Sequence, residues 1–300
     1  MHTSFVVKIL TVIVLCALLG ASASAHPGSG IVVNKQGEIF FTDTGRGVWK
    51  IDKDGNLSYM PASQFHWMAL DEVGYFAESQ KSFGEWFERV TPQGTKPALI
   101  MCSDFPLTVN RDGNLYYADT RRSSSWIVRR TPDGKESVLA SGEMFRDIAG
   151  IATGTDGSLY VTDATAIRKI TMDGKVSVFV SDFTSKERAN EPSLGTSYSY
   201  CRGLAVDSQG VMYVAATGSR RVLKITSDRK VSTILQSQKP WSPTGVAVFR
   251  GEVYVLEWSE PSSSQFEVRK AWIPRVRKVG QDGRRLDSSS KITTLATVSR

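Results

Sequence analysis

The sequence has few of the residues that hold transition metals or form disulfides. Its 300 residues include three cysteines and three histidines. Only His26 and His66 would remain after removal of a targeting segment, which is too few for a closed histidine site for zinc. No CxxC pair, nucleophile elbow or phosphate-binding glycine loop occurs either. The best-known short motifs of redox, serine-hydrolase and nucleotide chemistry are therefore excluded.

The sequence also lacks a strong charge of one sign. Its formal net charge of +7 is mild for this length, and proteins that bind nucleic acid usually concentrate their basic residues. The basic run at 269–285 alternates with Val276 and Val279, which is typical of a strand with one face in solvent. We therefore predict no nucleic-acid partner.

A long apolar run occurs only near the N-terminus. Lys8 precedes the apolar residues 9–19, and Ala23-Ser24-Ala25 fits the small-x-small pattern of a signal-peptidase site. A membrane span needs about 20 apolar residues, so this run is too short. We predict a signal peptide at 1–25, a mature chain of 26–300 without a membrane anchor, and a secreted or periplasmic location.

One pattern of four short strands recurs along the mature chain. In its clearest copy, residues 150–179, Asp156-Gly157 and Asp173-Gly174 form tight turns between runs rich in β-branched and aromatic residues. Second strands are expected at 39–43, 75–78, 115–119, 159–163, 212–216 and 253–257. Six copies spaced 37–53 residues apart predict one all-β domain, a six-bladed β-propeller of four-stranded antiparallel blades.

The copies also predict how the ring is arranged. Each blade takes its strands from consecutive sequence, so ring closure is expected to rest on side-chain packing between blades 1 and 6. Long insertions at 181–200 and 259–274 both fall on one face, which carries the loops into the innermost strands. We call it the loop face, and the face with the tight Asp-Gly turns the turn face. Long loops are often functional, so we expect the ligand on the loop face.

The blade pattern, with GIAT, DGSLYVTD and IRKIT in blade 4 and RGLAVDSQGVMYVA in blade 5, resembles NHL-repeat and gluconolactonase/regucalcin-like propellers over most of 30–298. Gluconolactonase-like members hold a divalent cation, often Ca²⁺, on a Glu, an Asn and an Asp just before the innermost strands. We call the corresponding residues here the mouth positions, and they are Ser29, His66, Phe105, Ala149, Arg202 and Thr244. None is Glu, Asn or Asp, so the metal motif is missing. Streptogramin lyases also resemble this architecture, but the histidine motif on which they rely is not found.

Residues that break the repeat are better site candidates than residues that recur in every blade. On the loop face they are aromatic or basic, which suits sugars, planar ligands and carboxylates or phosphates. The candidates for ligand binding are His66, Trp67, Arg146, Tyr198, Tyr200, Arg202, Arg220, Arg221, Trp241 and Trp258. The alternative is that the tryptophans and tyrosines fill the loop layer, and that His66 is hydrogen-bonded among aromatic side chains.

An acidic residue closes the second strand in five of the six copies. These residues are Asp43, Glu78, Asp119, Asp163 and Glu257. Five acids on one rim suggest a Ca²⁺ site, because hard cations prefer oxygen ligands. Their repetition favours a structural role, in which each carboxylate accepts hydrogen bonds from loop backbone or from the next blade.

Two cysteines, Cys102 and Cys201, remain in the mature chain. Both precede innermost strands on the same rim, and an exported protein meets an oxidising compartment. They form a disulfide or stay as two buried thiols, since blades 3 and 5 are not neighbours and disulfide geometry is strict.

Two hypotheses for the function follow. The first is an exported propeller that binds a small anionic or sugar-like ligand, or a partner protein, on the loop face. The second is a gluconolactonase-like hydrolase with an atypical cation site on the rim acids. The resemblance carries the second hypothesis, and a fold alone is a weak guide to function.

Overall fold

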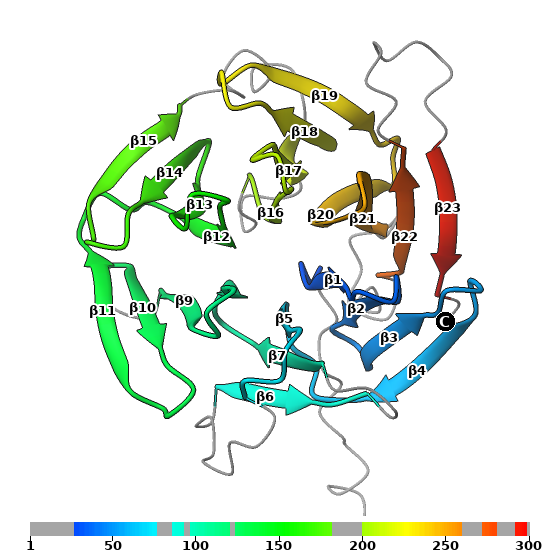
Figure 1. The fold of residues 1–300 in the computed structure, drawn as a ribbon. Helices are drawn as coiled ribbons and strands as arrows, with labels where there is room; N and C mark the ends of the chain where they lie inside the picture. Colours follow the sequence, from blue (N-terminus) through cyan, green and yellow to red (C-terminus); the bar gives the residue numbers. More distant parts are fainter. Residues whose placement is uncertain are drawn as a thin grey trace, which may run out of the picture.

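The computed structural model describes residues 27–76, 86–92, 97–120, 124–181, 200–259, 272–280 and 292–298. These residues form six antiparallel sheets arranged as a ring around one axis (Figure 1). The all-β, six-bladed propeller predicted from the repeats is therefore confirmed. The expected signal peptide at 1–25 lies outside the described residues.

Five of the described sheets have four strands each, in sequence order from the axis outward. Blade 1 consists of β1 (Ile31–Val33), β2 (Ile39–Asp43), β3 (Gly47–Ile51) and β4 (Leu57–Pro61). Blade 3 consists of β8 (Leu107–Val109), β9 (Leu115–Asp119), β10 (Trp126–Arg130) and β11 (Glu136–Ser141). Blade 4 consists of β12 (Ile148–Thr153), β13 (Leu159–Asp163), β14 (Ala166–Ile170) and β15 (Val176–Val180).

The last two blades follow the same plan. Blade 5 consists of β16 (Leu204–Val206), β17 (Met212–Ala216), β18 (Arg221–Ile225) and β19 (Val231–Gln236), with the short 3-10 helix η1 (Thr217–Ser219) after its second strand. Blade 6 consists of β20 (Trp241–Phe249), β21 (Glu252–Ser259), β22 (Pro274–Val279) and β23 (Ile292–Thr297).

The local sequence explains the regular blades. Second strands such as β9 and β13 are buried at all five residues, because neighbouring blades cover both faces of each sheet. Their aromatic and β-branched residues suit that position. Gly157 and Gly174 adopt φ of +78° and +86° in the tight turns, a conformation that costs glycine little. The hairpins therefore follow from local signals repeated along the chain.

Blade 2 departs from the predicted strand order. It contains β5 (Trp67–Asp71), β6 (Phe87–Val90) and β7 (Ala98–Cys102), and β7 lies between the other two. The second strand expected at 75–78 is not in that place: Tyr75 and Phe76 lie in the turn after β5, and residues 77–78 are outside the described ranges. All five residues of β7 are fully buried, so this apolar run takes the position that other blades cover on both faces.

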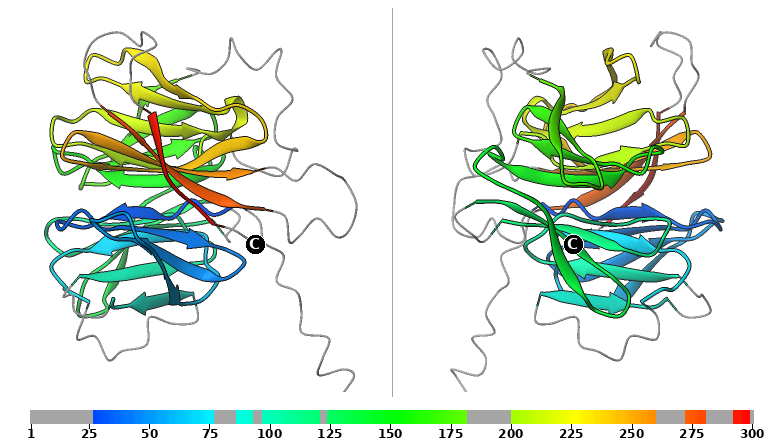
Figure 2. Two further views of the ribbon diagram at one scale, coloured as in Figure 1. Left: turned by 90° about the vertical axis from the view of Figure 1, so that its right-hand side faces the viewer. Right: turned by 60° about the vertical axis from the view of Figure 1, so that its left-hand side comes forward.

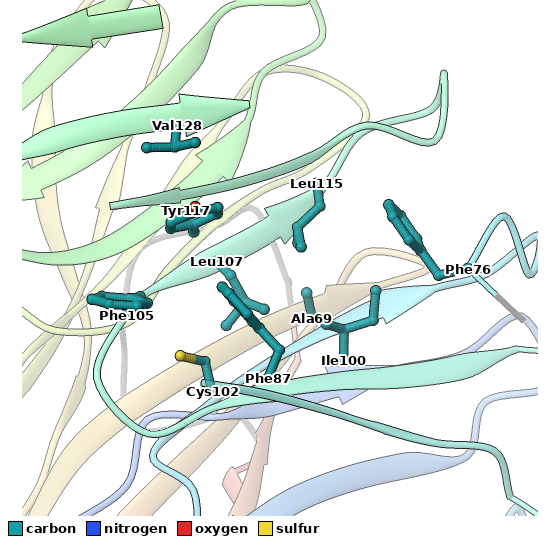
Figure 3. Packing of buried hydrophobic residues seen from close by; sticks show 10 residues of the cluster. All are labelled: Ala69, Phe76, Phe87, Ile100, Cys102, Phe105, Leu107, Leu115, Tyr117 and Val128. Carbon is teal, nitrogen blue, oxygen red and sulfur yellow. The ribbon is translucent and has the colours of Figure 1, made fainter. Parts of the chain in front are cut away.

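An aromatic cluster joins blade 2 to blade 3 (Figure 3). The ring centres of Phe87 and Tyr117 are 5.1 Å apart, and Phe105 lies 6.1 Å from Phe87 and 5.6 Å from Tyr117. Each such aromatic pair contributes about 0.5–1.5 kcal/mol beyond its buried area. The irregular blade is thereby held by side-chain packing against its regular neighbour.

The ring closes between blades 1 and 6 without exchange of a strand, as predicted. Their side chains share one hydrophobic cluster, which includes Phe41 from blade 1 and Leu256 from blade 6. The Thr244 hydroxyl and the Trp258 indole both donate to the Gly28 carbonyl, at 2.6 and 3.1 Å. Packing and these two hydrogen bonds therefore replace a shared strand.

Seen from the side, the strands of each blade run between the loop face and the turn face (Figure 2). None of the described residues belongs to a helix long and apolar enough to cross a lipid bilayer. Because the strands of all six blades run between the two faces, side chains from six blades come together at the two ends of the central channel.

Candidate functional site

Four glycines within or just before innermost strands bring neighbouring blades into close contact at the loop face. A Cβ atom on Gly150 would lie 2.1 Å from the Arg202 carbonyl oxygen, and one on Gly245 would lie 2.4 Å from the Ser29 carbonyl oxygen. Gly30 and Gly203 are similarly close to blades 2 and 6. Any side chain here would collide with backbone. We call Gly30, Gly150, Gly203 and Gly245 the glycine collar.

Blades 2 and 3 interrupt the glycine collar with Trp67 and Pro106. The Trp67 indole nitrogen donates to the Ala149 carbonyl of blade 4, at 3.2 Å. Contacts between consecutive innermost strands place the blades in the order 1 to 6 around the ring, so blades 2 and 5 are opposite each other. The Arg202 guanidinium of blade 5 nevertheless lies 5.8 Å from the centre of the Trp67 ring. These two side chains therefore meet across the axis at the loop-face end of the channel.

His66 supports Trp67 from the same strand end. Its ring lies edge-on to the indole, with centres 5.6 Å apart, and its Nδ1 is 2.8 Å from the Ser103 carbonyl oxygen. A carbonyl can only accept, so Nδ1 carries the proton in this hydrogen bond. The His66 carbonyl accepts from Ser29 and Gly30 of blade 1. His66 is thus hydrogen-bonded beside an aromatic ring, which was the alternative to a ligand-binding role for this residue.

A pocket of about 420 Å³ opens on the loop face beside Trp67, over blades 3 and 4. This volume lies within the range of small-molecule sites, about 300–1,000 Å³. Its walls include two aromatic side chains, three charged ones and three hydroxyls, from Trp67, Phe145, Asp104, Arg146, Asp147, Thr120, Ser124 and Ser125. The pocket therefore combines an aromatic surface with convergent polar groups, and we call it the loop-face pocket.

The rim acid Asp163 holds the loop that forms one wall of the loop-face pocket. Its carboxylate accepts the backbone N–H groups of Arg146 and Asp147, at 2.7 and 2.8 Å, and forms an ion pair with Arg168. These bonds fix the loop before β12 while the Arg146 side chain stays exposed. Asp163 therefore acts on the pocket through the loop that it holds.

A second cavity of about 550 Å³ occupies the channel at the turn-face end, lined by all six innermost strands. The polar residues at its rim are used in turns: Asn110 and Asp207 each accept backbone N–H groups of the hairpin that follows them. Its wall is formed largely by the innermost strands, and its charged residues Arg111, Asp112 and Asp207 belong to the hairpin turns at its rim.

The predicted ligand residues fall into two groups. His66, Trp67, Arg146 and Arg202 come together around the mouth and the loop-face pocket. The others lie elsewhere or outside the described residues, as follows: Tyr200 packs on Gly218, Arg220 is buried after η1, Arg221 bonds Gln236, Trp241 stacks on Arg275, Trp258 is fully buried at the ring closure, and Tyr198 is not described.

The described rim acids bond to nearby protein groups. Asp43 accepts from the Gly45 backbone and the Trp49 indole. Glu257, which is fully buried, pairs with Arg275 and accepts from the Ser237 hydroxyl. Asp119 is buried at the end of β9, and Glu78 lies outside the described residues. Asp43, Asp163 and Glu257 therefore have the local contacts that a structural role requires.

The mouth does not fit the divalent cation that the resemblance implies. None of the six mouth positions carries a carboxylate, and the Arg202 guanidinium, which is already positive, lies across the axis. Within the described ranges, no group of three or more His, Cys, Asp or Glu residues could hold a metal ion. The residues present favour an anion over a cation at the mouth.

Cys102 and Cys201 are buried and form no disulfide with each other in the structure. Cys102 belongs to the cluster between blades 2 and 3, and Cys201 to a separate cluster around blade 5. Of the two alternatives from the sequence, the structure has the buried thiols and not the disulfide, because the blades hold these strand entries in different interfaces.

Several solved propellers have a similar fold. The virginiamycin B lyase from Staphylococcus aureus has a TM-score of 0.51 at 15% identity, over 91% of this chain and 85% of the lyase. A gluconolactonase from Xanthomonas campestris has a TM-score of 0.53 at 14% identity, over 78% and 84%. A luciferin-regenerating enzyme has a TM-score of 0.57 at 16% identity, over 88% and 94%.

At these identities the similarity shows the fold alone. No protein-family model matches the chain, and no curated protein matches it. The resemblance to gluconolactonase-like propellers is thus supported for the architecture, and a gluconolactonase is among its structural neighbours. The activity has to be argued from the site.

The sequence did not point to every residue of the loop-face pocket. Asp104 immediately precedes the mouth position Phe105, and Asp147 lies two residues before Ala149. Their proximity to mouth positions is the signal that would have found them. Thr120, Ser124 and Ser125 come from the loop between the second and third strands of blade 3, where the run of three serines at 123–125 is the signal in the sequence.

Proposed function

We propose that this protein is an exported β-propeller that binds a small sugar-like ligand in the loop-face pocket. The observation that carries the proposal is the composition of the pocket wall. Trp67 offers an aromatic face for the C–H surface of a sugar, and Asp104 and Asp147 can accept hydrogen bonds from its hydroxyls. The hydroxyls of Thr120, Ser124 and Ser125 add groups that both donate and accept.

The pocket favours a small molecule over a partner protein. Its volume of about 420 Å³ suits one small ligand. Two carboxylates in the wall favour a ligand with hydroxyl donors over one that is anionic on every side. The hydrolase hypothesis needs a cation, and no observation at the described mouth favours one.

Isothermal titration calorimetry with D-glucose and sorbitol tests the proposal. We expect binding of at least one of them to the purified mature chain, and a loss of about tenfold in affinity in Trp67→Ala, because an aromatic contact of this kind is worth about 1.4 kcal/mol. Trp49→Ala is the matched control, since Trp49 is a partly buried tryptophan bonded to Asp43 in blade 1.

Circular dichroism must show that both variants are folded. Absence of binding, or equal binding by Trp67→Ala and the native chain, would overturn the proposed function. Export is tested separately by the N-terminal residue of the secreted protein, which we expect to be His26.

A further inference from the structure

The mouth carries a positive side chain, whereas a cation site presents negative ones. Among the six mouth positions, Arg202 carries a positive charge and no residue is acidic. Arg202 is only 6% exposed. A charge in such a poorly hydrated place interacts more strongly with a nearby opposite charge than it would in water.

The backbone of Arg202 is held rigidly between blades 4 and 5. Its N–H donates to the Ala215 carbonyl at 2.9 Å, and its carbonyl accepts from the Thr162 hydroxyl at 3.3 Å. Gly150 approaches the same carbonyl so closely that it leaves no room for a Cβ. The backbone that carries the guanidinium is therefore fixed, and a preorganised binding group needs such a fixed backbone.

A second buried polar group, from blade 1, occupies another mouth position. Ser29 is 7% exposed, and within the described part of the chain its Oγ has no hydrogen-bond partner. Its backbone N–H donates to His66, next to Trp67. A buried hydroxyl without a partner is unfavourable unless another polar group reaches it. Ser29 therefore adds a hydrogen-bond donor near the axis.

The site is thus polarised across Trp67. Asp104 and Asp147 come from the loops that lead into blades 3 and 4 and line the loop-face pocket, whereas Arg202 comes from blade 5 and lies 5.8 Å from the centre of the Trp67 ring. A ligand with one carboxylate would keep that group away from the two aspartates and direct it toward the axis. Its hydroxyls would face the aspartates.

We propose that the Arg202 guanidinium, without a metal ion, supplies the positive charge at the mouth, and that it selects a sugar acid over the matching neutral sugar. This rests on the proposed function, because the sugar part of the ligand occupies the loop-face pocket. Arg202 is here a specificity-determining residue that holds the carboxylate.

The experiment compares D-glucuronate with D-glucose by isothermal titration calorimetry in EDTA. The two differ by the carboxylate. We expect glucuronate to bind about tenfold tighter, as a hydrogen bond to a charged group implies, and addition of Ca²⁺ to leave the affinity unchanged. Arg202→Gln should reduce the preference to about twofold or less while the affinity for glucose stays the same. Arg221→Gln is the control, because Arg221 lies in the same blade and bonds Gln236.

Arg202→Lys covers the case in which Arg202→Gln does not fold. It keeps the charge, so it should retain part of the preference. Equal binding of the two sugars, a preference that survives in Arg202→Gln, or a need for Ca²⁺ would each overturn this inference and leave the proposed function standing. If neither sugar binds, the proposed function itself fails.

Discussion

Two arcs of the ring solve the same packing problem differently. In the regular arc, blades 4, 5, 6 and 1 each have a glycine of the collar within or just before the innermost strand, and backbones of neighbouring blades almost touch. In the irregular arc, blades 2 and 3 have Trp67 and Phe105-Pro106 at this level, and blade 2 also changes its strand order. The loop-face pocket lies beside the irregular arc.

The difference shows how a repeat acquires a site. In the regular arc, backbones of neighbouring blades meet at the glycine collar, which leaves no room for a side chain at those four positions. Where one copy departs from the pattern, a large side chain enters the mouth and the neighbouring loops form walls around it. The exception in the repeat is therefore the place to look for chemistry.

The largest effect is expected where the regular arc is tightest. Gly150→Ala would place a methyl group 2.1 Å from the Arg202 carbonyl oxygen, so one blade has to move. We expect unfolding to become easier by about 3 kcal/mol, the upper end for overpacking, and the melting temperature to fall by about 6 °C or more. Differential scanning calorimetry measures both.

Gly280→Ala is the matched control for this variant. Gly280 has open space around it and no positive φ, so its replacement should change stability by less than about 0.5 kcal/mol. Equal stability of Gly150→Ala and the native chain would show that the regular arc is not limited by backbone contact.

A smaller but more specific effect distinguishes the two possible strand orders of blade 2. If β7 is the middle strand, amides of Ala98–Cys102 are bonded or covered on both sides and should exchange with deuterium about tenfold more slowly than those of an outer strand such as β19. Hydrogen exchange with mass spectrometry measures this. If β7 were the outermost strand, as linear order would require, its exchange would match that of β19.

The smallest effect concerns the second tight turn of blade 5, at a position where the blade 2 sequence has no acidic residue. The Asp228 carboxylate accepts from the Thr226 hydroxyl and pairs with Lys230 at 2.9 Å, which lowers its pKa from 3.8 to about 2. Blade 2 has Gln93 at this position of its sequence. Because the folded pKa is the lower one, this contribution to stability is present above pH 3.8 and is lost as the pH falls toward 2.

Between pH 4 and 2, the melting temperature of Asp228→Asn should therefore fall slightly less than that of the native chain. Melting temperatures of the native chain and the variant across this window measure the difference. Thr226→Val removes the main donor and should act in the same direction. An identical pH profile for all three proteins would show that this turn contributes nothing measurable.

Much of the candidate site followed from searching for exceptions to the repeat. His66, Trp67, Arg146 and Arg202 were found in this way, because each breaks a pattern that other blades keep. Trp258 was selected by the same rule but serves the ring closure, where it donates to Gly28. A sequence pattern shows that a residue is unusual, and the neighbours that decide its role come from other blades.

The sequence by itself determined the six repeats, their hairpin turns and the closure without a shared strand, since these depend on short-range signals such as Asp-Gly turns and strand alternation. The tertiary structure alone decided that β7 enters the middle of blade 2 and that Trp67 reaches both Ala149 and Arg202. The two Trp67 contacts join residues 82 and more positions apart. The Trp67 contacts arise only when six sheets close around one axis, because that closure brings distant strand ends to a common mouth.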